Sequence, residues 1–294
     1  MKSQLKTPQV VVITGGNSGI GRSTAITLAK AGYKVFATMR SLERGAKLRE
    51  ATSKLDLDIT AIELDVSDDD SVTDGFRQIL GLTDQIDILI NNAGIGSNAV
   101  IEDVNIELDK EVIETNFWGP VRCIQAALPT MRAQRSGHIV QVSSIAGRIG
   151  LPAQPIYSAS KWALEGLSEN LAHDLTSFGI RVSILEPGVT RTAILGKNNT
   201  VPDNPDYEHV YGRMLDMYLE GIEANVRPEA VSETILECLE YQRKQLRWPV
   251  AWGADTMVNA RHDGSVPDED WIRIGSLVND REEWINCFKQ AFKL

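Results

Sequence analysis

The sequence predicts an α/β protein: a doubly wound parallel sheet with helices on both faces, in three αβα layers. Two observations lead to this prediction. Short apolar runs rich in β-branched residues alternate with longer segments of helical periodicity from Val10 to Leu185. A glycine-rich turn also joins the first apolar run directly to the first helical segment. Alternation of this kind is typical of parallel strands connected by crossover helices.

The composition is that of an ordinary globular chain, with 294 residues, 43% of them hydrophobic and 24% charged. The net charge of -10 argues against a nucleic-acid partner, since non-specific binding needs a cationic surface. No apolar run is long enough to span a membrane, and the N-terminus lacks the features of a signal peptide. Cys123, Cys238 and Cys287 form no C-x-x-C pair, so we expect reduced thiols in a cytoplasmic protein and no metal site.

The first strand is expected at Val10–Ile13, followed by the turn "TGGNSGIG" and a helix that stops at Gly32. Gly15 permits a tight turn, Gly19 lets the backbone approach a pyrophosphate, and Gly21 lets helix and strand pack closely. The helix N-terminus then offers unpaired N–H groups to phosphate. Strand, turn and helix together predict a Rossmann-type nucleotide site.

The second strand, Lys34–Met39, is followed by Arg40, at a point where folds that bind NAD place a carboxylate. A guanidinium suits a 2′-phosphate instead, through paired charge-assisted hydrogen bonds. The sequence therefore favours NADP(H) over NAD(H). The alternative is that Arg40, like Arg44, is only a solvated surface cation.

The next two strands also end in candidate cofactor residues. Ile59–Leu64 leads into Asp65 and Val66, at the carboxyl edge where ligands collect in doubly wound sheets. Ile86–Ile90 leads into "NNAG", whose small and amide side chains suit a turn against a cofactor, although this motif alone could be any turn.

A long helical pattern runs from about Ile106 to Arg132 and places Asn116 among apolar positions. A buried amide needs a hydrogen-bond partner. Pro120 predicts a local kink, and a carbonyl freed near Asn116 could hold water. The alternative is a polar residue that merely accompanies the kink.

The strand His138–Val142 delivers Ser144, and a helix is expected from Pro155 to about Phe178. Tyr157 and Lys161 are four residues apart, so both can point into one site. A free tyrosine has a pKa of about 10, and a nearby ammonium and an oxidised nicotinamide would lower it. Such a tyrosine could exchange a proton with a carbonyl or alcohol oxygen held by Ser144. The sixth strand is expected at Ile180–Leu185.

In combination, "TGGNSGIG", "NNAG", Asn116, Ser144, "YSASK" and "PGVTRT" resemble the short-chain dehydrogenase/reductase family over about residues 7 to 192, with a last strand near Leu246–Val250. The resemblance implies a catalytic tetrad of Asn116, Ser144, Tyr157 and Lys161. Tyr157 would be the acid/base and Ser144 would position the substrate oxygen. Lys161 would hold the nicotinamide ribose, and Asn116 would hold a water that relays protons to it.

The resemblance also implies a set of cofactor contacts beyond Tyr157 and Lys161. Phosphates would lie against Gly15, Ser18 and Ile20, adenine against Asp65 and Val66, adenosine against Asn92 and Gly94, and the carboxamide against Val189 and Thr192. The remaining implied cofactor residues are Asn17, Gly19, Gly21, Ala93, Pro187 and Gly188. Many NADP-preferring members carry a basic residue where this chain has Ser18, so the cofactor preference could be softer than Arg40 indicates.

The surroundings of Tyr157 look most like the branch that acts on steroids, retinol and other lipophilic carbonyl–alcohol pairs. We expect an NADP(H)-dependent enzyme with a small-molecule carbonyl or alcohol substrate; the alternatives are a family member acting on sugars or acyl chains, and a cofactor-sensing protein without turnover. Residues 1–294 are expected to form one domain, with a substrate lid at 193–225 and a helical extension at 251–294. The stripe Tyr207, Tyr211, Met214, Leu215, Tyr218 either lines that lid or packs on the core. By resemblance, a homodimer or homotetramer is expected.

Overall fold

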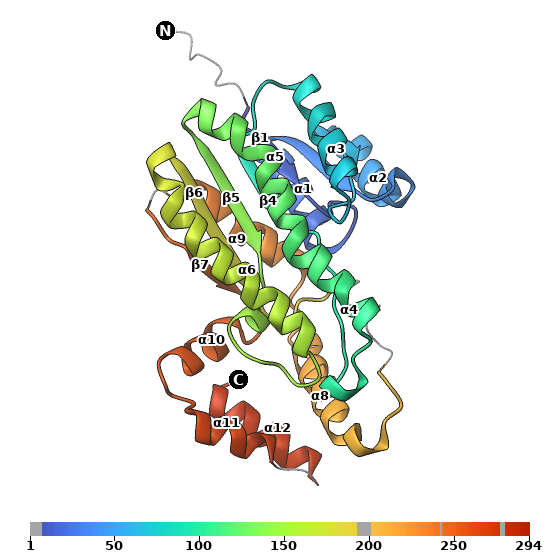
Figure 1. Cartoon of the computed structure of the whole chain (residues 1–294), viewed down its shortest axis with the longest axis vertical. Coiled ribbons are helices and arrows are strands. Elements are labelled where there is room, and N and C mark those ends of the chain that lie inside the picture. Colours follow the sequence, from blue (N-terminus) through green and yellow to red (C-terminus); the bar gives the residue numbers. More distant parts are fainter. Residues whose placement is uncertain (1–7, 193–200, 242, 277–279) are drawn as a thin grey trace.

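The computed structural model describes residues 8–192, 201–241, 243–276 and 280–294. Within them, seven parallel strands form one sheet in the order β3-β2-β1-β4-β5-β6-β7, as Figure 1 shows. The strands are β1 (Val10–Ile13), β2 (Lys34–Met39), β3 (Ile59–Glu63), β4 (Ile88–Asn91), β5 (Gly137–Val142), β6 (Ile180–Pro187) and β7 (Arg247–Val250). The doubly wound parallel sheet expected from the alternation is confirmed.

The strand order reverses at β1, which pairs with β2 on one side and with β4 on the other. Val11 is in register with Val35 and with Ile88. Chains leaving β1 and β4 therefore turn to opposite faces of the sheet and open a crevice at their carboxyl ends, where doubly wound proteins bind ligands.

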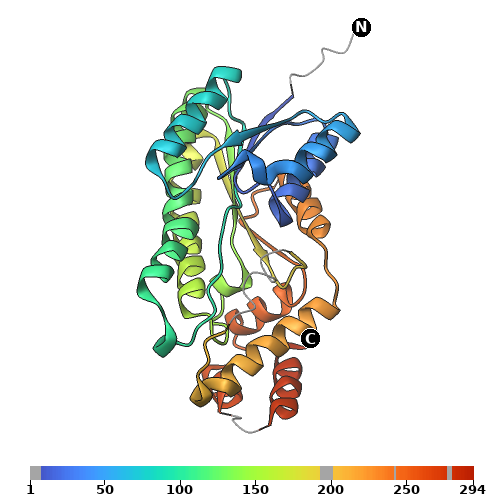
Figure 2. The ribbon, with the colours of Figure 1, turned by 90° about the vertical axis from the view of Figure 1, so that its right-hand side faces the viewer.

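Helices cover the sheet on both faces, and Figure 2 shows the three layers edge-on. One face carries α3 (Asp69–Leu82), α5 (Gly119–Gln134) and α6 (Pro155–Asp174), with α4 (Ile106–Ile113) continuing the line of α5 through a π-helical turn, η3 (Glu114–Trp118). The other face carries α1 (Gly19–Lys30), α2 (Ala46–Leu55) and α9 (Pro228–Glu240). Short 3-10 turns are η1 (Leu42–Gly45), η2 (Ile101–Asp103), η4 (Ile145–Gly147), η5 (Thr176–Phe178) and η6 (Pro205–Tyr207).

The central strand shows why the sheet is buried on both faces. Successive side chains of a strand point to opposite faces. Val10 and Val12 of β1 accordingly pack into the cluster under α3, α5 and α6, while Val11 and Ile13 pack under α1 and α9. Because both faces are apolar, β1 reads as a continuous hydrophobic run rather than an alternating one.

A third group of helices lies beyond the carboxyl end of the sheet. It consists of α8 (Glu208–Glu223), α10 (Ala254–His262), α11 (Asp268–Gly275) and α12 (Arg281–Phe292), seen at the bottom of Figures 1 and 2. These helices share a hydrophobic cluster with Ile145 and Ile149, which follow β5. The expected helical extension is therefore present in the described part of the tail.

Several boundaries differ from the expected ones, each for a local reason. The fourth strand begins at Ile88 because the Ile86 N–H is taken by the side chain of Gln134. The long helix expected at 106–132 is divided by the π-helical turn, which ends two residues before Pro120. In the described ranges no helix combines the length and apolar character needed to cross a bilayer.

Candidate active site

A cleft with a cavity volume of about 290 Å³ opens at the carboxyl edge of the sheet, where the strand order reverses. The predicted residues that line it are Gly15, Asn17, Ser18, Gly19, Ile20, Arg40, Asp65, Val66, Asn92, Ala93, Gly94, Ser144, Tyr157, Lys161, Pro187, Gly188, Val189 and Thr192. Of the predicted set, Gly21 and Asn116 lie beneath the cleft surface, and both are buried.

The glycine turn forms a cradle that side chains would fill. Gly15 has a φ of +68°, and a Cβ there would lie 2.9 Å from the Ala93 Cα. A Cβ on Gly21 would lie 2.4 Å from the Gly15 carbonyl oxygen. Ser18 is the N-cap of α1 but its side chain makes no capping hydrogen bond, so the start of the helix faces the cleft uncapped. This backbone fits a dinucleotide pyrophosphate.

Hydrogen bonds of Asn92 connect the glycine turn to the neighbouring strand β4. The Asn92 Nδ2 donates to the carbonyl oxygen of Thr14 at 2.9 Å and to that of Gly15 at 3.4 Å. Thr14 Oγ1 in turn accepts from the backbone N–H groups of Asn92 and Ala93, both at 3.0 Å. Sequence reasoning missed the supporting role of Thr14, although this threonine opens the glycine motif.

Two arginines line the cleft beside the end of β2. Arg40 follows β2, as expected, and Arg44 in η1 lines the same wall. The sequence offered Arg44 only as a surface cation, because its turn of 3-10 helix was not foreseen. Nearby, Asp65 is oriented by Ser67, whose hydroxyl donates to Asp65 Oδ1 at 2.6 Å.

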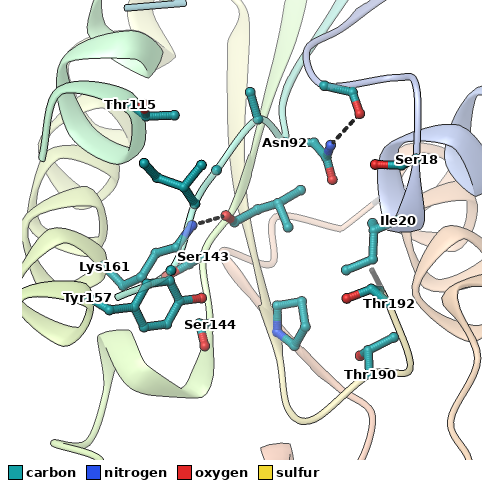
Figure 3. Close-up of a pocket in the computed structure, with 18 of the residues that line it drawn as sticks. Ser18, Ile20, Asn92, Thr115, Ser143, Ser144, Tyr157, Lys161, Thr190 and Thr192 are labelled. Carbon is teal, nitrogen blue, oxygen red and sulfur yellow. Dashed lines mark hydrogen bonds between the residues drawn. The ribbon is translucent and has the colours of Figure 1, made fainter. Parts of the chain in front are cut away.

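The opposite end of the cleft brings together three of the four predicted catalytic residues. In Figure 3, Tyr157 and Lys161 project from α6, and Ser144 lies beside the Tyr157 hydroxyl. Ser144 is the N-cap of η4, directly after β5, and its Oγ accepts from the Ala146 N–H at 3.1 Å. Lys161 Nζ donates to the Val142 carbonyl oxygen at 2.9 Å.

Burial controls the titration of this group of side chains. It raises the pKa of Tyr157, and a hydrogen bond with Ser144 opposes the rise. The sequence led us to expect a lowered pKa, but that expectation included an oxidised nicotinamide as well as the ammonium; in the protein alone, desolvation of the phenolate dominates. Burial also lowers the pKa of Lys161 to about 8, against the opposing charge of Glu165.

Asn116 supports this corner from within the π-helical turn. Its Oδ1 accepts from the Ile95 N–H at 2.9 Å, and its Nδ2 donates to the Ile95 carbonyl at 2.8 Å and to Ser160 Oγ at 3.1 Å. A Cβ on Gly94 would lie 3.2 Å from Asn116 Oδ1 and 3.8 Å from Lys161 Nζ, so the three residues are neighbours. Pro120 has no N–H to offer the Asn116 carbonyl, as the sequence indicated.

The cleft also contains Gln154 and Met217, which sequence reasoning did not select, and Tyr218, which belongs to the stripe considered for the lid. Gln154 Nε2 donates to Asn98 Oδ1 at 3.0 Å and to the hydroxyl of Tyr218, and Tyr218 also contacts Asn98 Oδ1 at 3.3 Å. Met217 lines the wall beside Tyr218. A glutamine directly before a helix start carries no signal of its own, so only the fold could place Gln154 here.

The stripe on α8 divides between the two roles considered for it. Tyr218 reaches the cleft, whereas Tyr211 and Met214 pack on Val100 and Ala153 and belong to a hydrophobic cluster. Leu215 is exposed. Of the expected lid at 193–225, residues 193–200 lie outside the described residues.

The C-terminal extension braces α8. Arg213 of α8 lies with its guanidinium 5.7 Å from the centre of the Trp284 ring, and Lys289 pairs with Glu220 at 2.7 Å. Arg281 pairs with Asp216 as well. Since α8 carries Met217 and Tyr218, the extension supports the wall of the cleft. In the described part of the chain, no three His, Cys, Asp or Glu side chains are arranged to hold a metal ion.

Comparison with known proteins agrees with this geometry. The family model "short chain dehydrogenase" matches residues 9–202. The chain is 36% identical over 259 residues to retinol dehydrogenase 8 of Bos taurus, covering 82% of this chain and 80% of that protein. It is 35% identical over 253 residues to human 17-beta-hydroxysteroid dehydrogenase type 1, covering 81% and 76%.

A solved structure gives the same result. The crystal structure of a short-chain dehydrogenase from Streptomyces avermitilis superposes with a TM-score of 0.80 at 28% identity, covering 92% of this chain and 99% of that one. The chain therefore belongs to the short-chain dehydrogenase/reductase family and is an oxidoreductase that acts on CH–OH/C=O groups with a nicotinamide cofactor.

Proposed function

We propose that the protein is an NADP(H)-dependent oxidoreductase that interconverts a lipophilic ketone or aldehyde with its alcohol, with Tyr157 as the acid/base. The observation that carries the proposal is the meeting of Ser144, Tyr157 and Lys161 in one corner of the cleft that the glycine turn opens. When bound, the cofactor supplies or accepts the hydride.

The side chains of this corner suit proton transfer to or from the substrate oxygen. The Tyr157 hydroxyl, beside Ser144, donates its proton to that oxygen during reduction and takes it back during oxidation. Ser144 holds the oxygen with its own hydroxyl. Lys161, fixed by the Val142 carbonyl, stabilises the phenolate that forms on Tyr157, and Asn116 holds the Gly94 turn against it.

The cofactor preference rests on Arg40 and Arg44. Both guanidiniums line the adenosine end of the cleft, where two cations suit a 2′-phosphate better than a free ribose hydroxyl. We expect Arg40→Ala to lower the affinity for NADPH about tenfold to a hundredfold and to leave NADH affinity unchanged, since each lost charge-assisted bond costs about 1.5–3 kcal/mol. Arg77→Ala, at an exposed site on α3, is the matched control. An unchanged ratio of the two affinities would remove Arg40 from this role.

The proposal of a lipophilic substrate is supported by apolar side chains that line the cleft. Ile145, Leu151, Val189 and Met217 line it, beside polar residues that include Gln154 and Tyr218. Apolar side chains of this kind, with polar groups that fix orientation, favour ligands that are themselves largely apolar. Retinol and steroids, the compounds in the names of the two relatives, have this character.

The decisive experiment follows NADPH consumption with a panel of ketones and aldehydes of increasing size and apolarity, alongside Tyr157→Phe. We expect turnover that rises with apolar size and falls about 10²–10⁴-fold in the variant, the contribution typical of general acid catalysis. NADPH titration by fluorescence checks that the variant still binds cofactor. A variant that binds NADPH and turns over like the native protein refutes the role of Tyr157. Tight NADPH binding without turnover in either direction favours the cofactor-sensing alternative.

We also propose a single domain over residues 1–294, a homodimer or homotetramer, and a cytoplasmic location. Trp118 and Trp162, on the outer side of the helical layer that contains α5 and α6, are 47% and 53% exposed, which supports a subunit contact there. The free thiols of Cys123, Cys238 and Cys287 support a reducing compartment. Light scattering that finds only a 32.4 kDa species would contradict the assembly, and cell fractionation tests the location.

A further inference from the structure

Behind the catalytic corner lies a buried cluster of charged side chains. Glu165 follows Lys161 by one turn of α6 and is 4% exposed, and Glu186, on β6, is 1% exposed. Arg247 of β7 reaches both carboxylates: its Nη2 lies 3.2 Å from Glu165 Oε2, and its Nε lies 3.1 Å from Glu186 Oε1. Arg148, just after η4, completes the cluster with its Nε 3.6 Å from Glu186 Oε1.

This cluster is packed directly against the catalytic residues. A Cβ on Gly147 would lie 2.8 Å from Ser143 Oγ, 3.0 Å from Glu165 Cγ and 3.0 Å from the Lys161 carbonyl oxygen. Ser143 precedes Ser144 in the chain. The side chain of Glu165 therefore packs against the backbone that carries Lys161 and Ser144, and because Lys161 and Glu165 are one turn apart on α6 and both buried, their side chains share one face of the helix.

Packing alone gives no reason for two carboxylates at this position. Glu165 Oε1 and Glu186 Oε1 have no hydrogen bond of good geometry, and apolar residues of similar size are commonly as stable as a buried ion pair. Buried ionisable groups with incomplete pairing are typical of functional sites. Lys161, the nearest residue with an assigned role, needs a counterion because burial disfavours its charged form.

We propose that Glu165 is a positioning residue for the reaction: its buried carboxylate is the counterion that keeps Lys161 charged, and Glu186 and Arg247 set how much negative charge Glu165 carries. The inference rests on the proposed role of Lys161. It adds a group that does not touch the substrate and acts only through Lys161.

Other charged groups near α6 are accounted for. Glu114 of η3 is paired with Arg122, and Arg181 of β6 donates to the carbonyls of Leu239 and Tyr241. Tyr157 and Tyr218 face the cleft as neutral phenols, since burial raises the pKa of both. On the elements packed against α6, Asp109 of α4 and Glu186 of β6 are buried, Arg148 follows η4, and Glu107, Lys110 and Glu111 of α4 are exposed.

The titration of the cluster agrees with this arrangement. The negative charge of Glu165 raises the pKa of Lys161 against the effect of burial, which brings it to about 8. Burial and the neighbouring Glu165 raise the pKa of Glu186 to about 7, and burial also raises the pKa of Glu165. The two carboxylates are therefore electrostatically coupled, and each has a pKa above that of a free glutamate.

The test compares Glu165→Gln with Glu169→Gln. Glu169 pairs with the same Nη2 of Arg247, at 2.7 Å, but its side chain is 57% exposed and lies one turn further from Lys161, so it is a matched control. Two quantities are measured: the pH profile of kcat/KM, and the pKa of Lys161 from 13C NMR of the cofactor-free protein with labelled lysine, assigned with Lys161→Arg.

Removing the counterion makes the ammonium lose its proton more easily. In Glu165→Gln we expect the pKa of Lys161 and the alkaline limb of kcat/KM both to move down by roughly one pH unit, the lower end of the effect of an adjacent opposite charge. Glu169→Gln should leave both in place. A purely structural role for Glu165 would change kcat or stability without moving either pH value.

A folded Glu165→Gln protein with the native Lys161 pKa overturns the inference. If that variant does not fold, Glu165→Asp replaces it, with a smaller shift in the same direction expected because the carboxylate is drawn back by one methylene; no shift is again the refuting result. Failure of the proposed function is seen separately, as an active Tyr157→Phe, while the NMR titration tests Glu165 without any turnover.

Discussion

Glu186 makes the stability of the fold depend on pH in a direction opposite to that of most carboxylates. Burial raises its pKa from 4.5 to about 7, so the folded protein holds a proton that the unfolded chain releases between these values. The stability contributed by this proton is complete below pH 4.5 and is lost as the pH rises through 7. The free energy of unfolding falls by about 3 kcal/mol over that whole interval, and by about 2 kcal/mol between pH 5.5 and pH 7.5.

The perturbation that tests this is Glu186→Gln, which keeps the size of the side chain and removes its titration. Urea unfolding followed by circular dichroism, at one protein concentration and at pH 5.5 and 7.5, gives the free energy of unfolding. Between pH 5.5 and pH 7.5, we expect the free energy of unfolding of the native protein to fall by about 2 kcal/mol more than that of the variant. This difference does not depend on the absolute stability of either protein. Glu169→Gln, at the exposed end of the same cluster, should keep the native pH dependence. If Glu186→Gln keeps it as well, the argument from burial is wrong.

Two further predictions concern the brace between α8 and the rest of the fold. A Cβ on Gly221 would lie 2.3 Å from the Cβ of Val189, so Gly221→Ala should destabilise the protein by about 1–3 kcal/mol and raise the KM for the cofactor. Gly212→Ala on the same helix should have neither effect, because the nearest atom to its Cβ would be 3.9 Å away. Urea unfolding and steady-state kinetics would show both effects, and equal stability of the two variants would contradict the packing argument. Trp284→Ala should cost about 3–5 kcal/mol because the ring is buried and stacks on Phe288, while Leu82→Ala, at an exposed position, should stay within about 0.5 kcal/mol. A Trp284→Ala protein as stable as Leu82→Ala would show that α12 does not stabilise the fold.

The parts of the molecule that follow from local periodicity could be predicted from the sequence. The alternation of strand and helix predicted the sheet, and the helical spacing of Tyr157 and Lys161 placed both side chains in one corner of the cleft. The break in the long helix was indicated by Pro120. Its form could not be predicted, because a π-helical turn depends on how the flanking helices pack rather than on a residue pattern.

Contacts between segments far apart in the chain could not be predicted, for a different reason. Glu165, Glu186 and Arg247 belong to α6, β6 and β7, and nothing in their separate segments indicates that the fold brings them together. Gln154 and Arg44 line the cleft from a helix start and from a 3-10 turn. Sequence periodicity does not determine the side-chain directions at such positions. The packing of α12 on α8 likewise depends on two segments far apart in the chain.

The hydrophobic cluster beyond the sheet has a consequence for how substrate range can change. It joins Ile145 and Ile149, one and five residues after Ser144, to Met217 and to Trp284 and Phe288 of the last helix. A chimaera that takes α8 and α10–α12 from a relative must therefore take the segment 145–151 with them, or the transplanted helices will meet a foreign surface next to the catalytic serine. The strands beside the glycine turn pack in two other clusters and can stay unaltered. The sheet and its glycine turn can therefore accept helices α8 and α10–α12 from a relative.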